Sequence, residues 1–191
     1  MSQSSNRTIL WMVVGLAAGG LVLCCCLALT GGLAWFAFQP DVSPDYTTSY
    51  DLPQVGQEAP DFTLELLNGG QVSLSEYRGQ PVFVNFWAIW CHYCIEEMPL
   101  IQDRYERYAG EMVFLVIDEG DFASDVEDFV QEQGYPFPVL LDPSYLAGDL
   151  YRIEGYPMSF FIDSDGVIRY VADGMMESAD MDAGLQAIGV K

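Results

Sequence analysis

Near its centre the chain reads Pro81-Val-Phe-Val-Asn-Phe-Trp-Ala-Ile-Trp-Cys-His-Tyr-Cys94. The apolar run over 81–87 is typical of a central strand that is buried on both faces. A helix over 94–108 is predicted from the helical spacing of the apolar residues that follow, namely Ile95, Met98, Ile101 and Tyr105. The two cysteines therefore lie where a buried strand passes into a helix.

Strands and helices alternate on both sides of this stretch. We expect strands over 62–66, 71–74, 112–117, 139–141, 159–163 and 167–171, and helices over 124–133, 144–151 and 177–188. The turn signal Asn68-Gly69-Gly70 joins the first two strands into a hairpin. Ser124, with Glu127 three residues later, predicts a capping box at a helix start. The order predicts an α/β domain with a mixed central sheet, flanking helices and an N-terminal hairpin.

The pair Cys91 and Cys94 predicts redox chemistry. Their spacing places both thiols on one face of a helix, close enough to bond. Unpaired backbone N–H groups and the helix dipole favour a thiolate at Cys91, and Cys-x-x-Cys sites lower a thiol pKa from about 8.5 to about 3.5–7.5. A thiolate of this kind attacks a disulfide, and the second cysteine resolves the mixed disulfide. We therefore assign attack to Cys91 and resolution to Cys94.

Two other uses of this pair stay open at the level of sequence. A structural disulfide is less favoured, because so short a loop contributes little loop-closure entropy. A copper-binding metallochaperone would need ligands besides the two cysteines. The single histidine of the chain, His92, lies between the cysteines, and no further cysteine follows Cys94. We expect no metal and no cofactor at the pair.

The N-terminal part predicts a membrane anchor. No residue over Thr8–Phe38 is charged, and the run is long enough to span a bilayer. Arg7 before it and Asp41 after it place the N-terminus in the cytoplasm and the acidic part outside. A cleaved signal peptide fits less well, because its apolar core would be shorter. Lipid attachment within Cys24–Cys26 also fits poorly, because Leu23 is bulky, and we expect these cysteines to pack as small apolar side chains.

The rest of the chain is strongly acidic. All 28 Asp and Glu residues lie from Asp41 onward, Lys and Arg together number seven, and the net charge is −21. A nucleic-acid partner is therefore not expected, since phosphate binding needs a basic footprint. We expect an anchor over 1–38, a proline-containing linker over 39–54, and a domain over 55–191 that is long enough for one core.

Two segments resemble a known family. Val82–Pro99 resembles the active-site stretch of the TlpA/ResA-type thioredoxin-like proteins, within the redoxin and AhpC/TSA-like superfamily, and Gly155–Asp163 resembles their second hallmark. The peroxiredoxin pattern Pro-x-x-x-Thr-x-x-Cys is absent before Cys91. The resemblance covers about 55–188 and implies a thioredoxin fold, membrane-anchored and outside the cytoplasm. It also implies exchange with protein thiols, such as those of apocytochrome c or other envelope proteins, and a membrane electron donor or acceptor whose identity stays open.

The resemblance implies roles for single residues as well. Pro157 would be a cis-proline that faces the disulfide, Tyr156 precedes it, and Trp90 would shield the cysteine pair. Glu97 matches an acid that tunes the thiols in ResA-like members, and a solvated helix face is the alternative role for this residue.

Several residues bear on substrate preference and on the direction of electron flow. Asn85 stands where thioredoxin has a buried aspartate, so that Glu97 or water would have to accept the proton. Met158 replaces the threonine that is common after the cis-proline, and we expect Met158 and the preceding Tyr156 to reshape the peptide groove. The family favours a reductase, whereas an imidazolium at His92 beside Cys91 would favour an oxidase, and both directions stay open.

Overall fold

The computed structural model describes residues 53–191, and this part of the chain forms a seven-stranded sheet with helices on both faces. Its strands are β1 (Thr63–Leu66), β2 (Gln71–Ser73), β3 (Val82–Trp87), β4 (Val113–Glu119), β5 (Val139–Asp142), β6 (Met158–Ile162) and β7 (Ile168–Asp173). Its helices are the 3₁₀ helix η1 (Leu74–Tyr77), α2 (His92–Tyr108), α3 (Ala123–Gln133), α4 (Leu146–Tyr151) and α5 (Ser178–Ala187).

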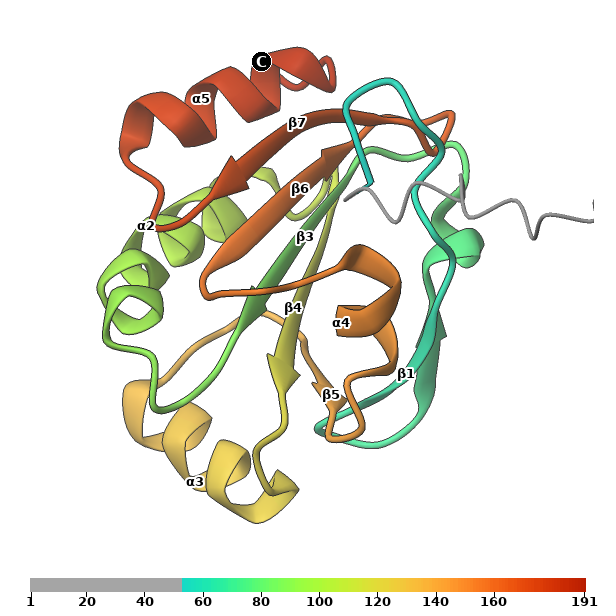
Figure 1. The fold of residues 1–191 in the computed structure, drawn as a ribbon. Coiled ribbons are helices and arrows are strands. Elements are labelled where there is room, and N and C mark those ends of the chain that lie inside the picture. The colour runs from blue at the N-terminus through green and yellow to red at the C-terminus, as the bar shows by residue number, and fades with distance from the viewer. Residues whose placement is uncertain (1–52) are drawn as a thin grey trace, which may run out of the picture. The chain divides into compact units, whose positions relative to one another are not determined.

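The strands pair in the order β2-β1-β5-β4-β3-β6-β7. The central strands β3, β4 and β5 run parallel, and the outer pairings are antiparallel. Figure 1 shows α4 in front of the sheet and α5 alongside β7. The predicted α/β domain with a mixed sheet and an N-terminal hairpin is confirmed.

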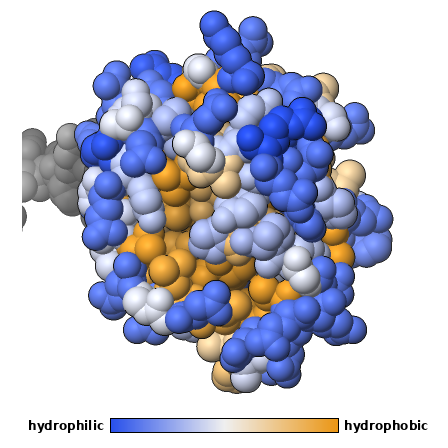
Figure 2. Space-filling view, turned by 180° about the vertical axis from the view of Figure 1, so that it is seen from behind, coloured by the Kyte–Doolittle hydropathy of each residue, from blue (hydrophilic) through white to orange (hydrophobic). Residues whose placement is uncertain are grey.

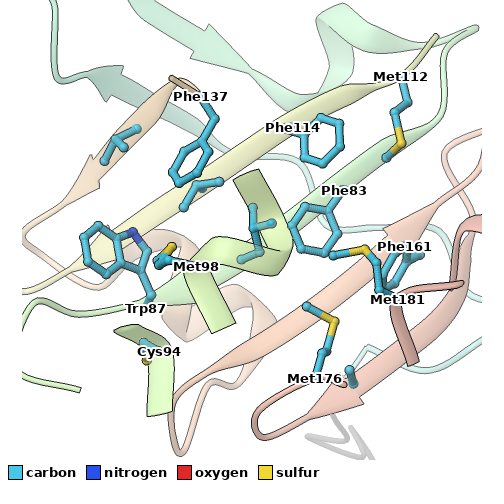
Figure 3. Packing of buried hydrophobic residues seen from close by; sticks show 14 of the residues in the cluster. Phe83, Trp87, Cys94, Met98, Met112, Phe114, Phe137, Phe161, Met176 and Met181 are labelled. Carbon is cyan, nitrogen blue, oxygen red and sulfur yellow. The ribbon is translucent and has the colours of Figure 1, made fainter. Parts of the chain in front are cut away.

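The sheet separates two apolar clusters. One lies between the sheet and the helices α2, α3 and α5, and it includes Phe83, Trp87, Met98, Met176 and Met181. Figure 3 shows these side chains converging around α2, with Cys94 at one end of the cluster. The other cluster is covered by α4 and the N-terminal hairpin. Burial on both faces explains why the central strands read as continuous apolar runs.

Strand β3 shows how the sequence positions the site. All six of its residues are buried. Phe83 and Trp87 face the cluster under α2, whereas Val84 and Phe86 face the opposite cluster. Because side chains alternate along a strand, Asn85 lies on the same side as Phe83, toward α2. A polar side chain is thereby held in the core, one layer beneath the active-site helix.

One predicted helix cap was wrong. Helix α3 begins at Ala123 with Phe122 as its N-cap, and no side chain caps it. Ser124 lies inside the first turn, because the Phe122 carbonyl already accepts the backbone N–H groups of Asp125 and Val126. The capping box at Ser124 and Glu127 is therefore replaced by backbone hydrogen bonds alone.

Among residues 53–191 no helix is both long enough and apolar enough to cross a bilayer. The predicted anchor over 1–38 lies outside the described residues.

Candidate active site

The two cysteines lie at the N-terminus of α2. Cys91 is the N-cap residue, in an extended conformation, and its Sγ accepts a hydrogen bond from the backbone N–H of Cys94 at 3.2 Å. The structure joins the two residues as a disulfide, with Cα atoms 5.2 Å apart. Cys91 is 6% exposed and Cys94 is fully buried. An attacking thiolate at Cys91 would therefore be stabilised by the free N–H groups and the dipole of the helix.

The disulfide lies at the end of the sheet where the parallel strands β3 and β4 terminate, which we call the sheet edge. Strand β3 ends at Trp87, and the backbone N–H of Cys91 donates to the Ala88 carbonyl at 3.1 Å. Strand β6 runs antiparallel to β3, with Met158 opposite Phe86, so the residue before Met158 returns to the same edge. That residue is Pro157, and its bond to Tyr156 is cis, as predicted.

Trp90 and Tyr156 form an aromatic wall on this edge. Their ring centroids are 5.6 Å apart and the rings meet at 80°, an edge-to-face contact. Trp90 is 68% exposed although it is large and apolar. The contact joins the loop before Cys91 to the loop that holds the cis-proline. An exposed aromatic surface therefore adjoins Cys91.

Glu97 is a buried acid one turn after Cys94. It is 2% exposed, so the alternative of a solvated helix face is wrong. Its Oε1 accepts a hydrogen bond from Asn85 Nδ2 at 2.8 Å, and its Oε2 accepts one from the backbone N–H of Met176 at 2.9 Å. Burial raises the pKa of Glu97 to about 7, and the two hydrogen bonds oppose that rise only in part. A carboxyl with this pKa exchanges protons readily near neutral pH.

Asn85 connects the sheet to this acid. Its Nδ2 donates to Glu97 and also to Ser159 Oγ at 2.9 Å, across the β3–β6 pairing. The strand position itself carries no acid, so the carboxyl is supplied from helix α2 and reaches the Asn85 side chain. The predicted substitute for the missing aspartate, Glu97, is thus in place beside that strand position.

His92 lies in the first turn of α2 and is largely exposed. Its Nε2 is 3.2 Å from Glu96 Oε1, one turn along the helix. Its ring lies 5.9 Å from the ring of Tyr93. The side-chain contact that the structure records for His92 is therefore with a surface carboxylate.

Two further acids at the same edge were missed by the sequence reasoning. Asp118 and Glu119 end strand β4, and each is 1% exposed. Burial raises the pKa of Asp118 to about 8, and the nearby carboxyl of Asp121 adds to this; burial likewise raises the pKa of Glu119 to about 7. The signal was present in the sequence, because two acids directly follow a buried run in the strand next to the one that leads to Cys91.

The site lies at the sheet edge, and it is separate from a pocket elsewhere on the domain. That pocket has a volume of about 230 Å³ and is lined by residues that include Leu66, Val72, Tyr105 and Phe114, but by none of the predicted site residues. Seen from behind, the surface shows apolar side chains in a hollow between hydrophilic ones (Figure 2). Within residues 53–191, no group of three or more His, Cys, Asp or Glu residues is arranged to hold a metal ion.

Comparison with known proteins agrees with this geometry. Residues 55–171 match the AhpC/TSA family. The chain is 36% identical over 135 residues to the thiol-disulfide oxidoreductase ResA of Geobacillus kaustophilus, covering 70% of this chain and 78% of that relative. It is 34% identical over 160 residues to ResA of Bacillus subtilis, covering 83% of each chain.

A solved structure shares the fold at low sequence identity. The exposed lipoprotein thioredoxin Etrx1 of Streptococcus pneumoniae superposes with a TM-score of 0.61 at 28% identity, covering 66% of this chain and 98% of that chain. A disulfide at a helix N-terminus, a cis-proline at the same sheet edge and close ResA relatives all indicate the same chemistry. The chain belongs to the AhpC/TSA family and is a ResA-like thiol–disulfide oxidoreductase with a thioredoxin-like fold.

Proposed function

We propose that the protein is a membrane-tethered reductant that transfers electrons from its Cys91–Cys94 dithiol to disulfides of proteins outside the cytoplasm. The observation that carries this proposal is the disulfide at the start of α2 with a buried carboxyl, Glu97, one turn away. The exposed wall of Trp90 and Tyr156 beside the disulfide suits a protein segment as the substrate.

The exchange proceeds in two steps. The Cys91 thiolate attacks a substrate disulfide, which forms a mixed disulfide and releases one substrate sulfur as a thiolate that takes up a proton. Glu97 then accepts the proton of the Cys94 thiol, and the Cys94 thiolate attacks Cys91 Sγ. The second substrate sulfur leaves and is protonated. The substrate has gained two electrons and two protons, and the enzyme ends with the disulfide that the structure contains.

The carboxyl next to the pair favours the reductant direction. Glu97 is buried one turn after Cys94. Burial raises its pKa to about 7, and whenever it is ionised it disfavours a nearby thiolate because like charges repel. A less stable thiolate destabilises the reduced form and makes the pair more reducing. His92 is paired with Glu96 in the structure, which offsets the oxidising influence that an imidazolium would have.

The location is part of the proposal and rests on the sequence. The uncharged run Thr8–Phe38 would be the anchor, residues 39–54 the linker, and residues 55–191 the redox domain. Arg7 and the acidic stretch after Asp41 would place the domain outside the cytoplasm. The similar protein of Streptococcus pneumoniae is named an exposed lipoprotein, which supports an extracytoplasmic role. Envelope proteins with cysteine pairs, apocytochrome c among them, are the proposed substrates.

The reduction potential of the pair tests the proposal. Full-length protein with Cys24, Cys25 and Cys26 replaced by Ala would be equilibrated with reduced and oxidised glutathione or dithiothreitol, so that only the active-site pair titrates. We expect a two-electron couple near the value of about −270 mV that thioredoxin shows. A value near about −120 mV would instead indicate an oxidant. A protein without a reversible couple, behaving like the matched Cys91→Ala control, would refute the exchange mechanism itself.

A further inference from the structure

The hydroxyl of Tyr156 ties the cis-proline loop to strand β4. It donates a hydrogen bond to Glu119 Oε2 at 2.8 Å, across 37 positions of sequence. Glu119 is the last residue of β4 and is 1% exposed, whereas Tyr156 is only partly buried. One end of this contact is therefore fixed in the sheet, and the other lies at the surface beside Pro157.

The chemistry of the two groups keeps the contact in place. Burial is the main cause that raises the pKa of Tyr156, and the carboxyl of Glu119 raises it further, so the phenol keeps its proton and remains the donor. Glu119 remains an acceptor whether or not it is ionised, because a protonated carboxyl retains acceptor oxygens. The hydrogen bond therefore persists across the physiological pH range.

The backbone of α4 leaves room for this carboxyl. A Cβ atom on Gly148 would lie 2.1 Å from Glu119 Oε1, which no real contact permits. Gly148 does not have a positive φ, so space is what requires a glycine here. At the residue after Glu119, a Cβ on Gly120 would lie 2.0 Å from the hydroxyl of Tyr145. Two glycines thus keep the surroundings of Glu119 open for its side chain and for a neighbouring tyrosine.

Tyr156 also contacts the residue that precedes the disulfide. The Tyr156 ring meets the ring of Trp90 at 5.6 Å, and Trp90 directly precedes Cys91. We propose that Glu119 and Tyr156 are a positioning pair that fixes the aromatic wall against which protein substrates dock, and so determine the affinity for protein substrates rather than the reactivity of the disulfide. The inference rests on the proposed function, because it names the surface through which protein substrates are recognised.

The test separates substrate docking from chemistry. Tyr156→Phe in the full-length enzyme removes only the hydroxyl and keeps the ring. We expect the KM for reduction of insulin disulfides to rise by about tenfold, which corresponds to about 1.4 kcal/mol, while kcat and the rate of exchange with dithiothreitol stay within about twofold. The matched control is Tyr170→Phe, which removes a similar hydroxyl-to-carboxylate contact, to Asp180, away from the disulfide; its KM should not change.

A second variant disturbs the contact between Glu119 and Tyr156 without replacing either residue. Gly148→Ala would displace the Glu119 carboxyl, and we expect the same rise in KM. If the KM of Tyr156→Phe equals that of the wild type, or if exchange with dithiothreitol slows as much as insulin reduction, the inference is refuted. A wild-type enzyme that exchanges with dithiothreitol but not with insulin would overturn the proposed function, and with it this inference; that outcome is distinguishable because it needs no variant.

Discussion

Replacing Glu97 by Gln should change how the stability of the oxidised protein depends on pH. Burial raises the pKa of this carboxyl from 4.5 to about 7, and each pKa unit corresponds to about 1.4 kcal/mol. Between these values the folded chain keeps a proton that the unfolded chain has lost, so the stability falls as the pH rises. The wild-type protein should therefore lose about 3 kcal/mol relative to Glu97→Gln between about pH 4 and pH 8.

Glutamine can keep most of the local contacts. Its carbonyl oxygen can accept the hydrogen bond from Met176, and its amide can donate to Asn85 Oδ1, which has no hydrogen-bond partner among residues 53–191. That rearrangement requires the Asn85 amide to rotate, after which the Ser159 hydroxyl would donate to Asn85 Oδ1 instead of accepting from Nδ2. The fixed cost of the substitution is thus expected to be modest and independent of pH, which leaves the ionisation of Glu97 as the source of any pH dependence.

The assay is urea unfolding of the oxidised wild type and the variant at several pH values. The matched control is Glu96→Gln, which removes the same charge from the adjacent, half-exposed position. The difference between wild type and Glu97→Gln should fall steadily through the interval, whereas the control difference should vary by less than about 1 kcal/mol. A difference for Glu97→Gln that is constant from acid to neutral pH would refute the argument that burial holds this carboxyl protonated.

Three more outcomes are expected. Cys94→Ser should trap substrate proteins as mixed disulfides on Cys91, visible by non-reducing electrophoresis, whereas Cys91→Ser should trap none; equal trapping by both would contradict the assigned order of attack. Asp118→Asn should raise the melting temperature at about pH 9 but not at about pH 4, because burial raises the pKa of this carboxyl to about 8 and the folded chain resists its ionisation. A gain of the same size at both pH values would argue against that cause. Gly184→Ala should cost about 1–3 kcal/mol, because its Cβ would lie 2.5 Å from a phenyl ring of β6, whereas Gly110→Ala has open space; equal urea midpoints for the two variants would show that α5 shifts freely.

The fold could be predicted from local patterns because its central elements have unambiguous ones. Strand β3 is buried on both faces and therefore reads as an apolar run in which Asn85 is the one polar residue. The hairpin of β1 and β2 has the turn sequence Asn68-Gly69, which is a strong signal for a β-hairpin. The start of α3 was harder to predict, because the Phe122 carbonyl accepts the first hydrogen bonds of the helix and Ser124 contributes no cap.

The environment of the site depends on contacts that no local pattern reveals. The spacing of Cys91 and Cys94 suffices to predict a redox pair, but it does not show whether Glu97 is exposed or buried. Its burial and its hydrogen bond from the backbone of Met176, which lies 79 positions later, follow only from the folded chain. The contact between Glu119 and Tyr156 spans 37 positions, and it follows only once the sheet brings the ends of β4 and β6 to one edge.

The two partners of Glu97 have a consequence for how the enzyme matures. One partner precedes the acid by 12 positions and the other follows it by 79, in the loop before α5. A chain growing from its N-terminus exposes both cysteines well before that loop has been synthesised. Until then Glu97 lacks its hydrogen bond from the Met176 backbone and is exposed to water, so its carboxyl keeps the ordinary pKa of a hydrated acid. We therefore expect the thiols of a nascent chain to lack the environment that tunes them until the loop before α5 has folded against Glu97.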